Sequence, residues 1–354
     1  MARRLVLAAF FVTYALVSVY VMLNYMHSNL LRDRYIPTHF GGLYEGTGFR
    51  PYVYRMLVPT LTRGVVELSP EWVESSVKNA VADFNARDTY PGIKRVMPWL
   101  TRALPAGDTA YARVATYAVV YASLIGYMAA MYFLAQAVFP VSRAMQLFAP
   151  VMAALAIPAF TWPFQYTYDF ATLFFSACCF YCMLKGKLRW YGVWFLLACL
   201  NKETAILIAV LFALWFFGRL PREQYVGMVA LQAIVWLVIK LTVIYAFMDN
   251  PGVMLEQRPA SVLEQDFFNN ANSFRILALA GLFFLLTYRW QEKPLLLRYA
   301  LWFVPVWLVA YILFGSPGEY RICFDMLPLL VLLVAHTLIE TTGIGQSSLF
   351  KEAS

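Results

Sequence analysis

Ionisable side chains occur in stretches of this chain that are otherwise apolar. The clearest case is Asn201, Lys202 and Glu203, which interrupt an apolar or small-residue run between Tyr191 and Phe217. Arginine can hold a phosphate through paired N–H bonds, lysine can hold it as a point charge, and a carboxylate can take a proton from an acceptor hydroxyl. Such groups cost about 2.5–3.5 kcal/mol each at membrane depth on insertion scales, so they indicate a functional interior.

The composition places the chain in a membrane. Of its 354 residues, 61% are hydrophobic and 14% are charged, whereas a soluble globular protein carries about 25% charged residues. Several apolar runs reach the roughly 20 residues that a transmembrane helix needs. We therefore predict an all-α polytopic bundle of about ten transmembrane helices. The net charge of +8 is attributed to basic cytoplasmic loops, and nucleic acid is not an expected partner.

The whole chain, 1–354, is predicted to be a single integral-membrane domain. Its apolar run at 5–26 exceeds the 7–15 residues of a signal-peptide core, so we expect an uncleaved first transmembrane helix with its basic end in the cytoplasm. An extracytoplasmic loop at 27–110, the remaining transmembrane helices at 111–340 and a cytoplasmic tail at 341–354 follow.

The topology depends on the polar interruption. Lys and Arg in short loops mark the cytoplasmic side, and a single helix over 191–217 would turn the next basic loop, with Arg219 and Arg222, outward. Two short helices that meet at Asn201 keep the basic loops inside. Asn is a strong N-cap, and an acid such as Glu203 is favoured in the first helical turn. The sequence thus predicts a helix start at Asn201, an outward-facing indentation and two cytoplasmic termini.

With this topology, polar residues of separate segments are expected on the outer face. The candidate general bases are Asp169 and Glu203 in the helical part, followed by Asp33 and Glu45 in the first loop. For any one residue, a structural ion pair at a helix end is an equally good interpretation. The remaining candidates would bind an anionic headgroup; with Glu203 they are Arg50, Tyr54, Arg55, Tyr168, Asn201, Lys202, Lys240, Glu319, Tyr320 and Arg321.

The first outer loop has a pattern of its own. From Val53 onward its apolar residues follow helical spacing, and a second helix start follows at Ser69. We expect two amphipathic helices that lie along the outer membrane surface, although the second could equally serve only to plug the bundle. His27 and His39 have poor metal-ligand spacing, and the cysteines fall mostly within apolar runs. No cofactor is therefore expected with certainty, and no motif supports a divalent metal.

The layout resembles that of the GT-C class of integral-membrane glycosyltransferases, in which a first transmembrane helix is followed by a long outer loop with amphipathic helices. The segments "YVYRMLVP", "YDFATLFF", "LNKETAIL" and "GEYRICFDMLPLL" also resemble recurring pieces of uncharacterised bacterial membrane proteins of this general type. Where that class carries an acidic residue or pair early in the loop, this chain has only Asp33 and then Glu45, with no D-x-D motif.

The resemblance implies hexosyl or pentosyl transfer from a polyprenyl-phosphate-linked sugar to a glycan, lipid or protein acceptor. The reaction would take place on the extracytoplasmic face of a bacterial inner membrane and serve cell-surface modification. By analogy, the base would be Asp33, Glu45 or Asp169. The phosphate would be held by Arg55, Lys202, Lys240 or Arg321.

Two other functions stay open. The broken helix and the charges at membrane depth are also typical of a transporter or lipid flippase. Alternatively, the chain is a non-catalytic membrane subunit that docks a partner through its long first loop. Substrate access from both sides would indicate the transporter, and a stable co-purifying protein would indicate the subunit.

Overall fold

The computed structural model contains only helices as regular elements in the residues that it describes. One isolated bridge, between Arg50 and Gly252, is the β-type pairing found among them. The all-α prediction is thereby confirmed. The described residues are 2–32, 38–86, 91–140, 142–161, 165–254, 261, 264, 273–315, 321 and 324–343.

Five helical segments of the described chain are long and apolar enough to cross a membrane. They indicate an integral membrane protein. These segments are α1 (Ala2–Arg32), α7 (Ala110–Val138), α8 (Arg143–Thr161), α12 (Arg222–Ala246) and the consecutive helices α15 (Leu295–Leu301) and α16 (Phe303–Phe314). The helix α1 continues beyond the predicted end at Met26.

The other apolar helices are shorter. They are α9 (Asp169–Leu184), α10 (Leu188–Asn201), α11 (Ile206–Phe216), α14 (Ser273–Thr287) and α17 (Leu327–Thr342). At about 1.5 Å per residue, the 14 residues of α10 extend only about 21 Å. Each apolar helix expected from the sequence thus coincides with a helix of the structure. The number of them that cross the bilayer stays a prediction.

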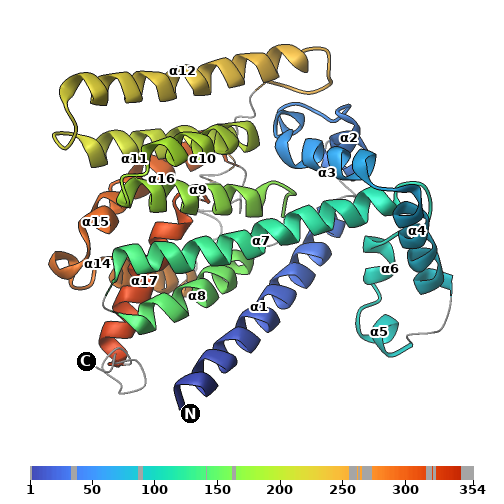
Figure 1. Ribbon diagram of the computed structural model, residues 1–354, viewed down its shortest axis with the longest axis horizontal. Helices are drawn as coiled ribbons and strands as arrows, with labels where there is room; N and C mark the ends of the chain where they lie inside the picture. The colour runs from blue at the N-terminus through green and yellow to red at the C-terminus, as the bar shows by residue number, and fades with distance from the viewer. Residues whose placement is uncertain are drawn as a thin grey trace.

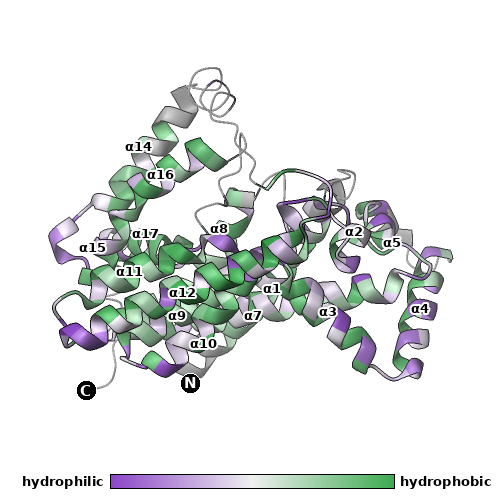
Figure 2. Cartoon of the chain, turned by 90° about the horizontal axis from the view of Figure 1, so that it is seen from above, coloured by the Kyte–Doolittle hydropathy of each residue, from purple (hydrophilic) through white to green (hydrophobic). Residues whose placement is uncertain are grey.

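The core lies between α7, α8, α9, α10 and α17, whose inner faces carry small and aromatic residues. Ala149, Ala153 and Ala154 of α8 are fully buried, and a Cβ on Gly126 of α7 would come within 3.0 Å of the Phe174 ring of α9. Small residues allow membrane helices to approach closely, because burial of apolar surface gives little driving force in lipid. Figure 2 shows the apolar colouring of these helices and the polar residues in the loops and α4.

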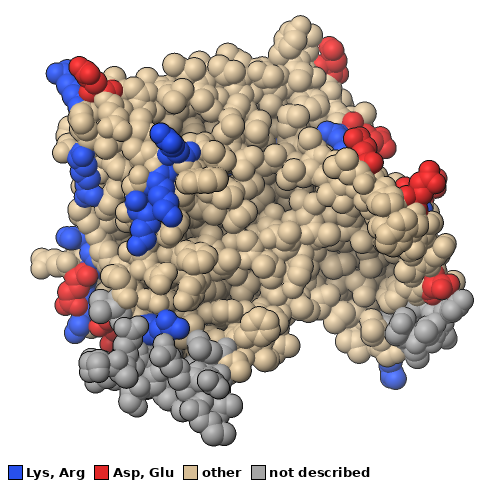
Figure 3. All heavy atoms as spheres, in the orientation of Figure 1, with Lys and Arg blue, Asp and Glu red and all other residues tan. Residues whose placement is uncertain are grey.

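The helices run back and forth between two ends of the bundle. Figure 1 shows the loops α7–α8, α9–α10 and α11–α12 at the same end as the N-terminus. These loops carry the basic residues Arg143, Lys185, Lys187, Arg219 and Arg222. Figure 3 shows charged side chains gathered toward the two ends of this face, mostly Lys and Arg on the left, with a broad uncharged surface between them.

The first loop forms a small helical region at the opposite end (Figure 1). It contains α2 (Phe40–Glu45), the short η2 (Tyr52–Tyr54), α3 (Leu57–Leu68), α4 (Glu71–Ala86), α5 (Pro91–Val96) and α6 (Leu100–Ala103). In α3, Val58 and Thr62 are buried, whereas Leu61, Val65 and Leu68 are exposed. The helix therefore presents apolar side chains on two faces, as expected for a helix that packs on the bundle and also meets lipid.

The predicted interruption of the apolar run is present, but its local chemistry differs from the prediction. Asn201 is the last residue of α10, Lys202 is extended (φ −157°, ψ 139°), and the 3-10 turn η3 (Glu203–Ala205) leads into α11. Asn201 does not cap the second helix. Its side-chain amide donates instead to the Tyr168 carbonyl at 3.0 Å and to the Thr172 hydroxyl at 2.8 Å. These bonds hold the Asn201 side chain against the start of α9, and it does not cap α11.

Candidate functional site

Seven charged side chains gather where the α10–α11 break meets the first loop, α12 and the segment before α17. We call this group the ionic cluster. It consists of Arg55, Asp169, Lys202, Glu203, Lys240, Arg321 and Asp325. The structure thus brings together candidates that lie far apart in the sequence.

One ion pair joins the first loop to the break. Arg55 Nη2 lies 2.6 Å from Glu203 Oε1, and Arg55 Nε donates to Oε2 at 3.3 Å, so the guanidinium holds the carboxylate with two parallel bonds. Arg55 Nη1 also donates to the Tyr168 hydroxyl. The two side chains keep 12% and 28% of their surface exposed. This pair is therefore within reach of a ligand.

The second ion pair is closed to solvent. Arg321 Nη1 lies 3.3 Å from Asp169 Oδ1, with 4% and 0% of the two side chains exposed. The other oxygen, Asp169 Oδ2, accepts the Tyr166 backbone N–H at 2.7 Å. The Arg321 guanidinium carbon lies 3.2 Å from the centroid of the Tyr166 ring, and Nη1 donates to the Tyr168 hydroxyl at 3.1 Å. Tyr168 therefore accepts bonds from both arginines and links the two pairs.

The break is fastened on two further sides. The Lys202 ammonium donates to the Arg321 carbonyl at 3.4 Å, and the Thr204 hydroxyl donates to Asp325 Oδ2. On the other side, Trp236 Nε1 of α12 donates to the Glu203 carbonyl at 2.7 Å. These bonds satisfy backbone and side-chain groups that the interrupted helix leaves free, which membrane interiors require.

From the sequence, Asp325 is expected among the polar residues of the last outer turn, without a role as base or substrate ligand. Its carboxyl is almost completely buried, and burial raises its pKa above the ordinary value despite the nearby Lys202. The signal available in the sequence was its position in the outer turn "GEYRICFDMLPLL", between polar residues and the apolar helix α17.

Among the four cations of the ionic cluster, Arg55, Lys202 and Arg321 donate hydrogen bonds to protein groups, whereas the Lys240 ammonium keeps its donors for other acceptors. It lies in α12, which is long and apolar enough to cross a membrane, is half-buried, and stands over the Tyr54 ring at 4.9 Å from the centroid. Within the described part of the chain, no carboxylate lies within 4.0 Å of its ammonium group, although it is close enough to stabilise the charge of Glu203. Its three N–H donors suit an anionic ligand.

A backbone contact fixes the end of α12 to the first loop. Asn250 donates to the Gly46 and Gly48 carbonyls at 2.9 Å. Arg50 is bound in the same contact, because its N–H donates to the Pro251 carbonyl at 2.8 Å and its Nη2 to the Gly252 carbonyl at 3.0 Å. Arg50, a predicted substrate ligand, thus holds the loop to the end of α12.

Other predicted residues are not part of this arrangement. Glu45 is exposed at the end of α2, and none of the cluster contacts involves it. Tyr54 is near the cluster through Lys240. Asp33, Glu319 and Tyr320 lie outside the described residues.

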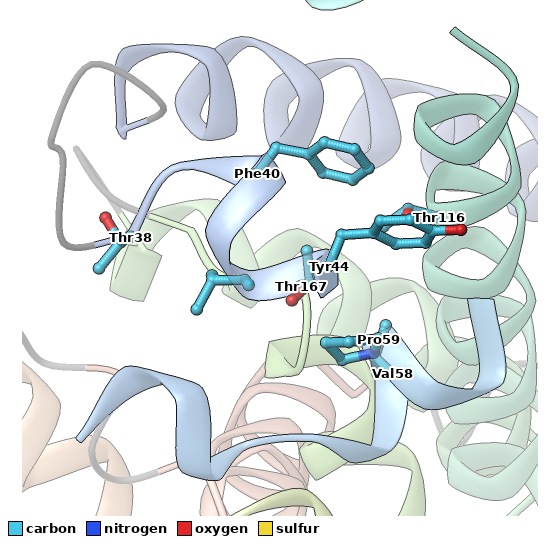
Figure 4. Close-up of a pocket in the computed structure, with 8 residues that line it drawn as sticks. Thr38, Phe40, Tyr44, Val58, Pro59, Thr116 and Thr167 are labelled. Atoms are coloured by element: carbon cyan, nitrogen blue, oxygen red, sulfur yellow. The ribbon is translucent and has the colours of Figure 1, made fainter. Parts of the chain in front are cut away.

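A small pocket lies between α2, α3, α7 and the segment that precedes α9. Figure 4 shows Phe40 and Tyr44 of α2 reaching toward α7, where Thr116 lies. Its lining has no charged side chain, and it includes Thr167 between the two tyrosines that contact the arginines. The pocket therefore has the chemistry of a neutral site, not of an anion site.

The ionic cluster contains four cations and three carboxylates, so it can accept a further anion. Among the described residues, no group of three or more His, Cys, Asp or Glu side chains could hold a metal ion. No family model matches the chain, and neither do any curated protein or solved structure. The resemblance to GT-C enzymes consequently stays a hypothesis.

Proposed function

We propose that this chain is an integral-membrane glycosyltransferase that uses a polyprenyl-phosphate-linked sugar and transfers it to a glycan, lipid or protein acceptor. The observation that carries the proposal is Lys240, an ammonium on a transmembrane helix with free donors beside the Arg55–Glu203 pair. A cation at membrane depth is costly unless it serves a ligand or a path. A lipid-linked phosphate delivers an anion at that depth.

The side of the membrane follows from the loops. The break between α10 and α11, around which the ionic cluster gathers, lies at the end of the bundle opposite the basic loops and the N-terminus (Figure 1). By the positive-inside rule, that end is extracytoplasmic and both termini are cytoplasmic. This orientation supports a reaction on the outer face of a bacterial inner membrane, where polyprenyl-phosphate sugars serve as donors in GT-C chemistry.

The contacts suggest a division of roles. Lys240, Lys202 and Arg55 would hold the donor phosphate, Lys240 first because its donors are free. Asp169 would position Arg321 and Tyr166, because both of its oxygens are occupied and its surface is buried. A general base must approach an acceptor hydroxyl to about 3 Å, and Glu203 is better exposed for that role.

The test is mass spectrometry of the lipids that co-purify with the protein in detergent. The wild type is compared with Lys240→Gln and with Lys78→Gln, a matched control on α4, where Lys78 pairs with Glu74 at the surface. We expect a polyprenyl phosphate or its glycoside with the wild type and the control, and at least a tenfold loss with Lys240→Gln. Bulk phospholipid alone in all three samples would contradict the proposal.

One observation favours a second function, that of a transporter or flippase. The helices α10 and α11 meet at an extended residue, Lys202, and interrupted helices of this kind form midplane sites in transporters. Movement of a labelled lipid phosphate across proteoliposomes in both directions, without any transfer of sugar, would support that function over the transferase.

A further inference from the structure

The carboxylate of Glu203 occupies the position of an anionic ligand. It sits in the fork of Arg55 at 2.6 and 3.3 Å, and Lys240 adds a second positive charge nearby. A phosphate diester is bound by arginine in the same two-bond geometry, and it presents further oxygens that can accept from the Lys240 ammonium. A phosphate that reaches Lys240 therefore competes with Glu203 for Arg55.

The other described acids of the cluster cannot exchange in this way. Asp169 has no exposed surface and is held by both Arg321 and the Tyr166 N–H. Asp325 is 1% exposed and accepts from Thr204. Glu203 keeps 28% of its side chain exposed, and its backbone is fixed independently through Trp236. Its carboxylate can leave Arg55 without moving the helix break.

We propose that the donor phosphate displaces Glu203 from Arg55, and that the released Glu203 carboxylate is the catalytic base. This inference rests on the proposed function and adds its order of events: the base is withheld in the ion pair until the donor is bound. In the empty site, Arg55 would compensate the charge of the Glu203 carboxylate. In the loaded site, the same carboxylate would be available to accept a proton. Arg55 has one role in each state, first with the carboxylate and then with the phosphate.

The chemistry balances with the groups present. Glu203 accepts the proton of the acceptor hydroxyl, and the acceptor oxygen forms a bond to the anomeric carbon of the sugar. The bond between that carbon and the phosphate oxygen breaks, and the electron pair leaves with the polyprenyl phosphate. Arg55 and Lys240 stabilise the charge on the departing phosphate. The proton on Glu203 passes to water when Glu203 returns to Arg55.

The displacement step is tested by binding of undecaprenyl phosphate to the detergent-solubilised full chain. Glu203→Gln keeps the size of the side chain and removes its charge, so we expect about tenfold tighter binding than in the wild type, because couplings between two binding events usually change an affinity by about 5–150-fold. The matched control is Glu74→Gln on α4, which should bind as the wild type does. Equal or weaker binding by Glu203→Gln would refute the displacement while leaving the transferase function intact.

Two further arms complete the design. Glu203→Asp shortens the side chain and should also bind undecaprenyl phosphate more tightly than the wild type, which covers the case that Glu203→Gln fails to fold. Inorganic phosphate is measured in parallel: a comparable gain with it would show that the ligand is a soluble anion and overturn the lipid assignment. No binding of undecaprenyl phosphate by the wild type, together with no sugar transfer, would refute the proposed function itself.

The role as base has a separate readout. The assay measures the release of polyprenyl phosphate from the lipid-linked sugar that mass spectrometry has identified. For Glu203→Gln we expect kcat to fall at least a hundredfold, because general bases contribute about 10²–10⁴ in rate. We expect KM to fall as well. Glu203→Asp should restore part of kcat. A Glu203→Gln variant that retains full kcat would show that another group takes the proton.

Discussion

The buried pair between Asp169 and Arg321 offers the strongest energetic test of the site. Replacement of Asp169 by Ala leaves the Arg321 guanidinium charged with 4% of its side chain exposed. It also leaves the Tyr166 N–H without its 2.7 Å acceptor. Replacement of Arg321 by Met leaves the opposite charge on Asp169, although the Met side chain can still pack on the Tyr166 ring.

The size of the effect follows from burial. Removal of one partner of a buried ion pair costs about 3–5 kcal/mol, because the remaining charge stays desolvated and loses its opposite charge. The double variant Asp169→Ala/Arg321→Met contains neither charge, so its destabilisation should be smaller than the sum of the two single changes. Contacting residues couple by about 0.5–3 kcal/mol, and full burial places this pair at the upper end, about 2–3 kcal/mol.

The assay is unfolding by SDS in mixed micelles, followed by circular dichroism, for the wild type, both single variants and the double variant. Glu74→Ala supplies the control, because Glu74 and Lys78 form an exposed pair at 2.8 Å on α4, and such a pair contributes no more than about 0.5 kcal/mol. Additive losses from Asp169→Ala and Arg321→Met would refute the pairing. Single losses below about 1 kcal/mol would show that water reaches the pair.

Two further predictions concern the framework. Gly252→Ala should destabilise the protein by about 1–3 kcal/mol in thermal unfolding, because Gly252 has φ +99° and a Cβ there would lie 2.5 Å from the Arg50 carbonyl oxygen. The control, Gly227→Ala in an open part of α12, should be neutral or slightly stabilising. Equal effects of the two substitutions would contradict the steric argument. Lys293 is buried and donates to Thr337, and burial lowers its pKa to about 8. An unfolded lysine has a pKa of about 10.4, so the unfolded state binds more protons between pH 8 and 10 and stability rises with pH there. The Lys293→Met variant should lack this rise in stability. Parallel pH profiles of the unfolding temperature for the wild type and Lys293→Met would contradict the assignment of the rise to Lys293.

The sequence predicted the parts of the fold that depend on local composition. The apolar helices are recognisable because each is a continuous hydrophobic run, and the interruption at Asn201 to Glu203 is recognisable because three polar residues break such a run. The topological argument from Arg219 and Arg222 also required a break there. Local composition therefore suffices to find the elements and the place where one of them is interrupted.

The partners within the site were beyond the reach of the sequence. The pair of Arg55 with Glu203 spans 148 positions, and that of Arg321 with Asp169 spans 152. Nothing in the local pattern of either segment favours one acid over another. Asn201 shows the same limit, because its capping tendency was outweighed by acceptors on α9 that only the packed bundle supplies.

The predicted base illustrates why burial decides chemical roles. Asp169 and Glu203 are both acids at an apolar helix start, and the sequence ranked them together. In the structure one has no exposed surface, whereas the other keeps 28%. A carboxylate whose two oxygens are already used holds its neighbours in place, and one with an exchangeable partner can act on a substrate.

The helix break and the ionic cluster depend on each other. An interrupted transmembrane helix leaves N–H and C=O groups that lipid cannot satisfy, and a cluster of charges in the bilayer needs a protein wall around it. Here Trp236 of α12 satisfies the Glu203 carbonyl at the break, while Asn201 and Thr204 bind the break to the start of α9 and to Asp325. The same contacts bring α12, with its Lys240, against Glu203 and Arg55. A straight helix through this position would remove both the demand for these contacts and the place where an anion can be bound.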